Sequence, residues 1–155
     1  MVDGHYGCQE KFPDFEALQA SGALETLGQV QFEDDIYNLT AIAFSDEEHG
    51  WAVGEYGFTY RTENGGETWE HKGLEATGRI GRVVVHPRDA DVVYACALGH
   101  AYGPQQERGV YRTTDGGENW EAINTGLTQV YIDALEIDPA DSTILYAATN
   151  RGGVF

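Results

Sequence analysis

Hydrophobic and aromatic residues recur along this chain in short runs, each bounded by glycine, proline or acidic residues. LTAIAF (39–44), GWAVG (50–54) and RVVVH (82–86) are examples, rich in β-branched or aromatic side chains. Runs of this length and composition predict β-strands. Within an N-terminal extension of residues 1–28, DFEALQAS predicts a short helix with Asp14 as its N-cap. The rest of the chain is expected to be all-β.

The runs form a repeat. LTAIAFSDEEHGWAVGEYGFTYRTENGGETWE aligns with IGRVVVHPRDADVVYACALGHAYGPQQERGVYRTTDGGENWE, and a third copy starts at IDALEIDPADSTILYAATNRGGVF. Repeats of this length with four strand-like runs predict the blades of a β-propeller. We expect three units in residues 29–155, namely 29–70, 71–121 and 122–155, which amount to about three blades.

Two nonapeptides are the most similar parts of the repeat: RTENGGETW (61–69) and RTTDGGENW (112–120). Asp or Asn followed by two glycines predicts a tight turn, because glycine reaches positive φ cheaply and the Asx side chain accepts backbone N–H bonds. The final tryptophan can cover the turn and lie between blades. We therefore expect structural roles for Thr62, Asn64, Gly66, Trp69, Thr113, Asp115, Gly117 and Trp120.

The charge balance excludes some partners. The chain has 26 Asp plus Glu against 9 Lys plus Arg, a net charge of -17, and its lysines are Lys11 and Lys72. Such a surface repels nucleic acids and anionic lipids, and no apolar run approaches the ~18 residues of a membrane span. The scarcity of lysine favours a halophilic source, in which molar salt screens the repulsion; the alternative is an acidic mesophilic domain.

The N-terminus and the cysteines add little chemistry. MVDGHYGCQEKFPDF lacks the basic start and apolar stretch of a signal peptide, so the sequence as written predicts no export. Cys8 and Cys96 make neither a disulfide framework nor a zinc pattern, and His5 with Cys8 is a weak metal site. No metal or cofactor is expected.

Both nonapeptides resemble the Asp-box, or bacterial neuraminidase repeat, of sialidase, sortilin-type, xyloglucanase-type and photosystem II assembly-factor propellers. HGWAVGEYGFTYRTENGGETW is similar to blades of the assembly factors. Residues 72–120 resemble sortilin-related prokaryotic propellers that are often labelled glycosyl hydrolases. The resemblance covers about residues 39–155 and implies a propeller in which the eight motif residues are structural. Asn64 departs from the usual Asp, and the catalytic residues of sialidases and xyloglucanases are not placed here.

Propellers close with about four to eight blades, which is more than this chain supplies. The third copy stops at GGVF, before its turn and outer strand. Either the chain is a fragment of a longer propeller, or it is a homodimer. In the homodimer, QVQF (29–32) of one copy would complete the GGVF blade of the other and close a six-bladed ring. The strand content favours the homodimer.

A ligand is expected on the face opposite the nonapeptide turns, where channel-mouth loops gather. These loops are GEYG (54–57), GLEATGR (73–79), GHAYGPQQERG (99–109) and TNRGG (149–153). The alternative is that they are ordinary exposed loops with solvated charges. The candidate ligand-binding residues are Tyr56, Glu75, Arg79, His100, Tyr102, Glu107, Arg108, Asn150 and Arg151, with Gln105 and Gln106 beside them.

The leading functional interpretation is a non-catalytic scaffold that binds a protein or glycan through these loops, with no catalytic residue. One alternative is a glycoside hydrolase or sialidase relative, in which Glu75 and Glu107 form the carboxylate pair. Another is an assembly chaperone, implied by the resemblance to the photosystem II factors. Because one fold hosts many functions, the choice depends on the site.

Overall fold

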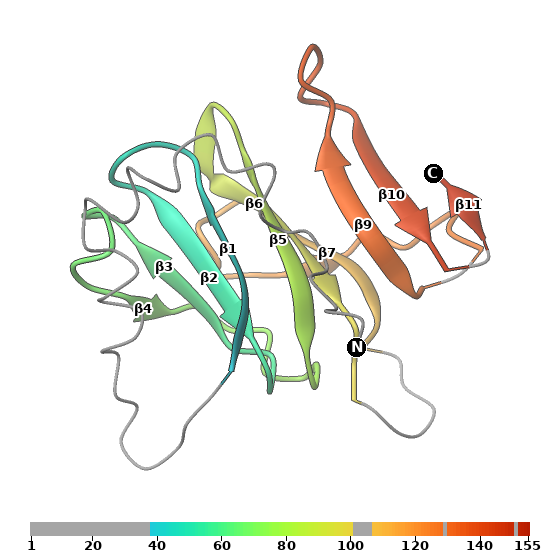
Figure 1. The fold of residues 1–155 in the computed structure, drawn as a ribbon, viewed down its shortest axis with the longest axis horizontal. Helices are drawn as coiled ribbons and strands as arrows, with labels where there is room; N and C mark the ends of the chain where they lie inside the picture. Colours follow the sequence, from blue (N-terminus) through green and yellow to red (C-terminus); the bar gives the residue numbers. More distant parts are fainter. Residues whose placement is uncertain (1–37, 101–106, 129, 151) are drawn as a thin grey trace, which may run out of the picture.

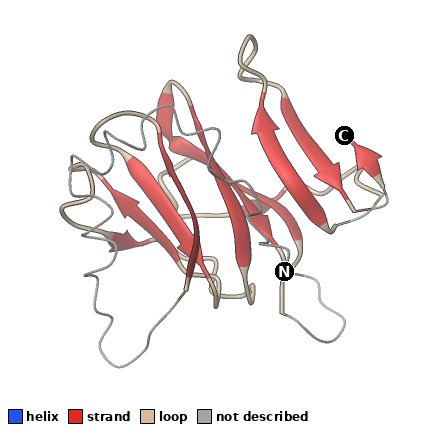
Figure 2. Ribbon diagram, in the orientation of Figure 1, coloured by secondary structure: helices blue, strands red, loops and turns tan. Residues whose placement is uncertain are grey.

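The computed structural model describes residues 38–100, 107–128, 130–150 and 152–155. These residues form eleven strands in three antiparallel sheets and contain no helix (Figures 1 and 2). The all-β prediction is confirmed. The expected helix in DFEALQAS, the QVQF strand and its pairing with GGVF all involve residues outside those described. No helix of the described residues is long and apolar enough to cross a membrane.

Each sheet is a meander of neighbouring strands. The first contains β1 (Leu39–Phe44), β2 (Gly50–Gly54), β3 (Thr59–Thr62) and β4 (Glu70–His71). The second contains β5 (Ile80–His86), β6 (Asp89–Ala97), β7 (Gly109–Thr113) and β8 (Glu121–Ala122). The third contains β9 (Ile132–Ile137), β10 (Leu145–Thr149) and β11 (Gly153–Val154).

The sequence repeat is also a repeat of strand register. Trp51 of β2 pairs with Ala43 and Arg61 on its two sides, and Tyr94 of β6 pairs with Val84 and Arg112. Equivalent residues of the first two copies therefore occupy equivalent places in their sheets. This regularity follows from a side-chain period of two, which fixes the register wherever one face of a strand is buried.

The sheets lie side by side and bury their apolar residues against one another (Figure 1). One core cluster joins the first and second sheets, and another joins the second and third. In the second cluster, the Cys96 thiol donates to the carbonyl oxygen of Ile132 at 3.3 Å. Burial raises the pKa of Cys96 to about 12, so this thiol is an inert packing group.

The first cluster contains Trp51, Val53, Ile80, Val83, Val93 and Ala95. The second contains Cys96, Val110, Ile132, Leu135 and Ala147. The mainly β-branched strands thus place their apolar side chains between sheets, where removal from water stabilises the packing.

Candidate functional site

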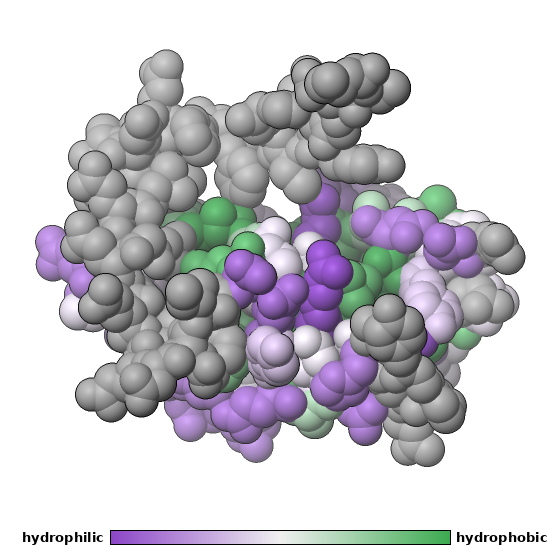
Figure 3. Space-filling view, turned by 60° about the horizontal axis from the view of Figure 1, so that its bottom comes forward, coloured by the Kyte–Doolittle hydropathy of each residue, from purple (hydrophilic) through white to green (hydrophobic). Residues whose placement is uncertain are grey.

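The connections that follow β2, β4, β6, β8 and β10 emerge at one end of the sheets, the lower end in Figure 1. We call this end the loop face; its described residues are 55–58, 75–79, 98–100, 107–108, 123–131 without 129, and 150–152 without 151, while residues 72–74 line a separate cleft. Figure 3 turns this end forward and shows hydrophilic side chains gathered in the middle, with hydrophobic ones to either side.

The first two sheets meet on the loop face at Tyr56. Its backbone N–H donates to the carbonyl oxygen of Gly78 at 2.6 Å, and Glu55 forms an isolated bridge with Arg79. Tyr56 and Gly57 both have positive φ, 57° and 70°. A Cβ at Gly57 would collide with the carbonyl oxygen of Leu74, so the turn needs glycine there. This tight turn holds the Tyr56 side chain outward, 60% exposed.

Leu98 links two of the candidate residues, Arg79 and Arg108. Its backbone N–H donates to the carbonyl oxygen of Arg79 at 2.8 Å. Its own carbonyl oxygen accepts a bond from Nε of Arg108 at 2.9 Å. His100 lies against Gly78, where an added Cβ would collide with the imidazole ring. Arg79, His100 and Arg108 are therefore all held near the C-terminal end of β6.

Arg108 connects the second sheet to the third. Its guanidinium carbon lies 4.6 Å from the ring centroid of Tyr131, and Nη1 donates to the Tyr131 hydroxyl. Nη2 donates to the carbonyl oxygen of His100 at 2.8 Å. The backbone oxygen of Tyr131 accepts from the N–H of Asn150 at 2.8 Å. The contacts thus run without a break from Tyr56 to Asn150, across all three sheets.

The structure therefore brings together five of the sequence-predicted ligand residues: Tyr56, Arg79, His100, Arg108 and Asn150. The two glutamates take other partners. Glu75 faces Nδ1 of His71 on β4 at 3.4 Å. Glu107 acts on Tyr111, whose pKa is raised first by burial and then by the Glu107 charge. Tyr102, Gln105, Gln106 and Arg151 lie outside the described residues.

Tyr131 is the residue that sequence reasoning missed. It lies in the connection between β8 and β9, the counterpart of GLEATGR between β4 and β5, and 49% of it is exposed. The sequence could have indicated this residue, because Tyr131 is an aromatic residue that directly precedes a strand in the second of two equivalent connections.

The two nonapeptide turns have the same internal bonding. In the first, the Thr62 hydroxyl accepts from the N–H of Gly66, and Oδ1 of Asn64 accepts from the N–H of Thr68, both at 2.9 Å. In the second, Thr113 accepts from Gly117 at 2.9 Å. Oδ1 of Asp115 accepts from the N–H of Asn119, also at 2.9 Å.

Asp115 accepts one hydrogen bond more than Asn64. In both turns the threonine hydroxyl donates to Oδ1, Thr62 at 2.9 Å and Thr113 at 2.8 Å. The Asn119 side-chain amide also donates to Oδ2 of Asp115 at 2.8 Å. These bonds, first that of the Asn119 side chain, then its backbone and then Thr113, lower the pKa of Asp115 to about 2. The second turn is therefore built around an ionised carboxylate.

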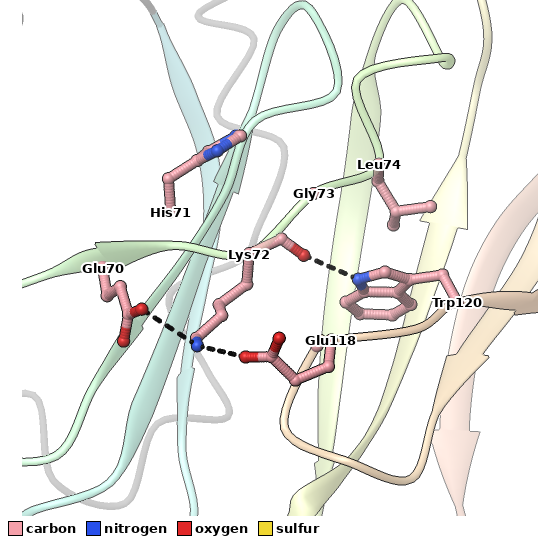
Figure 4. A pocket seen from close by; sticks show the side chains of 8 residues that line it. Glu70, His71, Lys72, Gly73, Leu74, Glu118 and Trp120 are labelled. Atoms are coloured by element: carbon pink, nitrogen blue, oxygen red, sulfur yellow. Dashed lines mark hydrogen bonds and ion pairs between the residues drawn. The ribbon is translucent and has the colours of Figure 1, made fainter.

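A shallow cleft of about 400 Å³ lies near the second turn and is shown in Figure 4. Lys72 crosses it, with Nζ 3.1 Å from Glu70 and 2.7 Å from Glu118, and its side chain is only 11% exposed. Hydrogen bonds to Glu118 and then Glu70 raise the pKa of Lys72. Because its charged groups are engaged in joining two sheets, we regard the cleft as structural and the loop face as the candidate site.

Comparison with curated proteins finds a similar sequence in the photosystem II assembly lipoprotein Ycf48 of Synechococcus sp. (strain CC9902). The two are 28% identical over 93 residues, which is 60% of this chain and 25% of Ycf48. The chain therefore spans a quarter of the length of this relative. No family model matches the chain.

Among the solved structures that are similar to this chain, three have a TM-score of 0.55. Ycf48 bound to a D1 peptide is 21% identical, over 78% of this chain and 36% of that one. Ycf48 from Cyanidioschyzon merolae is 25% identical, over 76% and 33%. An ancestral GH74 enzyme is 16% identical, over 76% and 17%. These neighbours are β-propellers, and the chain has the same fold over part of a propeller.

Proposed function

We propose that this chain is a non-catalytic propeller scaffold that binds a segment of another protein on its loop face, as an assembly chaperone does. The observation that carries the proposal is the unbroken set of contacts from Tyr56 to Asn150. The similarity to Ycf48, one structure of which contains a D1 peptide, supports a protein ligand over a glycan.

The loop face has two exposed tyrosines, Tyr56 and Tyr131, and the framework holds both in place. Tyr56 is fixed by the turn at Gly57, and Tyr131 by Arg108 on its ring and Asn150 on its backbone. Aromatic side chains held in this way provide contact area at little cost in conformational entropy, which is why tyrosine is enriched in binding surfaces. A bound segment would lie across them.

The proposal also includes the nature of the turns and the blades. We propose that the two nonapeptide turns are Asp-box turns, and that the units 29–70, 71–121 and 122–155 are successive blades. The shared hydrogen-bond pattern of Thr62 with Asn64 and of Thr113 with Asp115 supports this. On this view the turns keep the blades regular, and the connections at the other end are left to vary with function.

The proposal is tested by selecting peptides from a random ten-residue library by mRNA display on the immobilised protein. Selected peptides are then measured against Tyr131→Ala and against Tyr146→Ala as a matched control. Tyr146 is 43% exposed on β10 and donates to Asp138, away from the loop face. We expect Tyr131→Ala to weaken binding about tenfold, as removal of a hot-spot tyrosine does, and Tyr146→Ala to leave it within twofold. Equal losses, or no selected peptide, would refute the proposal.

The competing hydrolase needs Glu75 and Glu107 to act as a pair. Retaining and inverting glycosidases place their carboxylates about 5 to 10 Å apart across one bond. Here Glu75 faces His71 of the first sheet, while Glu107 influences Tyr111 of the second. Hydrolysis of aryl-glycosides by the wild type that is lost in both Glu75→Gln and Glu107→Gln would establish the enzyme instead.

A further inference from the structure

The positive charges in the described part of this acidic protein differ in whether they are paired with carboxylates. Seven of its lysines and arginines lie in the described residues, and four of these form ion pairs with carboxylates: Arg61, Lys72, Arg82 and Arg112. Among the described residues, the three arginines outside these pairs are Arg79, Arg88 and Arg108. Two of the three lie on the loop face.

Arg79 and Arg108 both bond to Leu98 on that face. The carbonyl oxygen of Arg79 and Nε of Arg108 bond to the N–H and C=O of the same residue, Leu98. The other bonds of the Arg108 guanidinium in the described structure go to a carbonyl and a phenol, neither of which carries a charge. Arg79 is exposed. Within the described residues, the loop face thus holds two arginines that form no ion pair, in a protein of net charge -17.

The carboxylates nearest in the chain do not take up this charge. Glu55 pairs with Arg79 only through the backbone bridge, and its Oε2 accepts from the Asn38 amide at 3.1 Å. Glu107 precedes Arg108 without forming an ion pair with it in the described structure. Among the described residues, neither arginine forms an ion pair with a carboxylate. A guanidinium that is not paired in this way can donate to an incoming carboxylate, and its planar geometry suits this better than the ammonium group of Lys.

We propose that the loop face recognises a carboxylate of its protein ligand through Arg79 and Arg108, so that its preferred segment is acidic. This rests on the proposed function and specifies the chemistry of the ligand. The charge of the whole protein acts in the opposite sense, because a net -17 attracts basic peptides and repels acidic ones at long range. A preference for acidic peptides can therefore come only from a local site.

The peptide library provides the test when it is selected separately on the wild type, Arg79→Gln and Arg88→Gln. Arg88 is a matched control because it is also exposed and outside the ion pairs, but lies in the turn between β5 and β6, where it donates to Ser142 at 2.9 Å. Arg79→Gln is expected to fold normally, because its side chain bonds to nothing in the described structure.

On the wild type and on Arg88→Gln, the selected peptides should be enriched in Asp and Glu over the input. On Arg79→Gln the enrichment should disappear, and a wild-type-selected peptide should bind it about tenfold more weakly. Replacing the acidic residues of that peptide with Asn and Gln should produce a similar loss.

Three outcomes would overturn the inference. Selection of basic or neutral peptides whose binding depends on Tyr131 would refute it but leave the proposed function standing. If Arg79→Gln still selects acidic peptides, the carboxylate is bound elsewhere. The same conclusion follows if Arg88→Gln loses the preference for acidic peptides as fully as Arg79→Gln does. If no peptide is selected on any variant, the inference and the proposed function fall together.

Discussion

The indole N–H of Trp120 donates to the carbonyl oxygen of Lys72 at 2.8 Å, so the turn of the second sheet is bonded to the residue that follows β4 of the first. The Trp120 ring also meets Trp51 edge-on, with centroids 5.9 Å apart. Its repeat equivalent, Trp69, instead donates to Gly66 of its own turn at 3.1 Å. The same motif position therefore joins two sheets in one copy and closes its own turn in the other.

This difference predicts unequal effects of two matched substitutions. Trp120→Phe removes the bond between sheets and thins their shared core, so the free energy of unfolding should fall by about 2 to 3 kcal/mol. Trp69→Phe removes a bond within one turn and should cost about 1 kcal/mol. Urea denaturation of both variants measures the difference. Equal losses, or a larger loss for Trp69→Phe, would contradict the assignment of Trp120 as the joint between sheets.

Two glycines with similar backbone conformations but different surroundings allow the cost of backbone strain to be distinguished from the cost of steric collision. Gly117 and Gly126 have almost the same φ, 89° and 93°. An added Cβ at Gly117 would lie 2.7 Å from both Lys72 and Trp51, whereas at Gly126 it would meet nothing within 4 Å. Gly126→Ala should therefore cost only the ~1 kcal/mol of a left-handed alanine, and Gly117→Ala about 3 kcal/mol or more. Thermal unfolding of the two variants compares them, and similar losses would show that the space around Gly117 adjusts freely.

The two turns should also respond differently to acid. The pKa of Asp115 is about 2 in the folded protein and near 4 when unfolded. Because folding lowers this pKa, the carboxylate stabilises the fold above about pH 4, and its contribution is lost as the pH falls towards 2. The stability difference between wild type and Asp115→Asn should therefore shrink over this window.

Asn64 provides the control for that titration, since its amide does not ionise. Asn64→Asp should acquire an acid-dependent difference of the same sign, because the Thr62 hydroxyl and the Thr68 N–H can both donate to the new carboxylate. Urea midpoints between pH 5 and 2 report both effects. A constant difference between wild type and Asp115→Asn throughout that range would contradict the bonding described for the second turn.

The excess of acidic residues makes a separate prediction about salt. A net charge of -17 opposes the compact state through self-repulsion, which salt screens. If the chain is adapted to a halophilic cell, its Tm should rise steadily from dilute buffer to molar KCl. An unchanged Tm over that range would favour the acidic mesophilic domain.

Local chemistry explains what could be predicted from the sequence. Alternating apolar runs and glycine turns depend on near neighbours, so the strands and the position of Asn64 in its turn could be derived from the chain. The link between Arg79 and Arg108 depends on Leu98, an apolar residue whose backbone alone is involved. The contact of Tyr131 with Arg108 needs the third sheet to be docked first. Such relationships arise from tertiary packing and leave no local pattern.

The most direct test of the loop-face site is a chemical-shift map of the ¹⁵N-labelled 17.0 kDa protein, titrated with a selected peptide. Our account predicts that the largest changes fall on the backbone amides of Tyr56, Gly78, His100, Arg108, Tyr131 and Asn150, while those of Asp46, His49, Asp138 and Thr143 at the opposite end stay fixed. Changes centred on those opposite turns, or on the cleft around Lys72 and Trp120, would show that the ligand binds elsewhere.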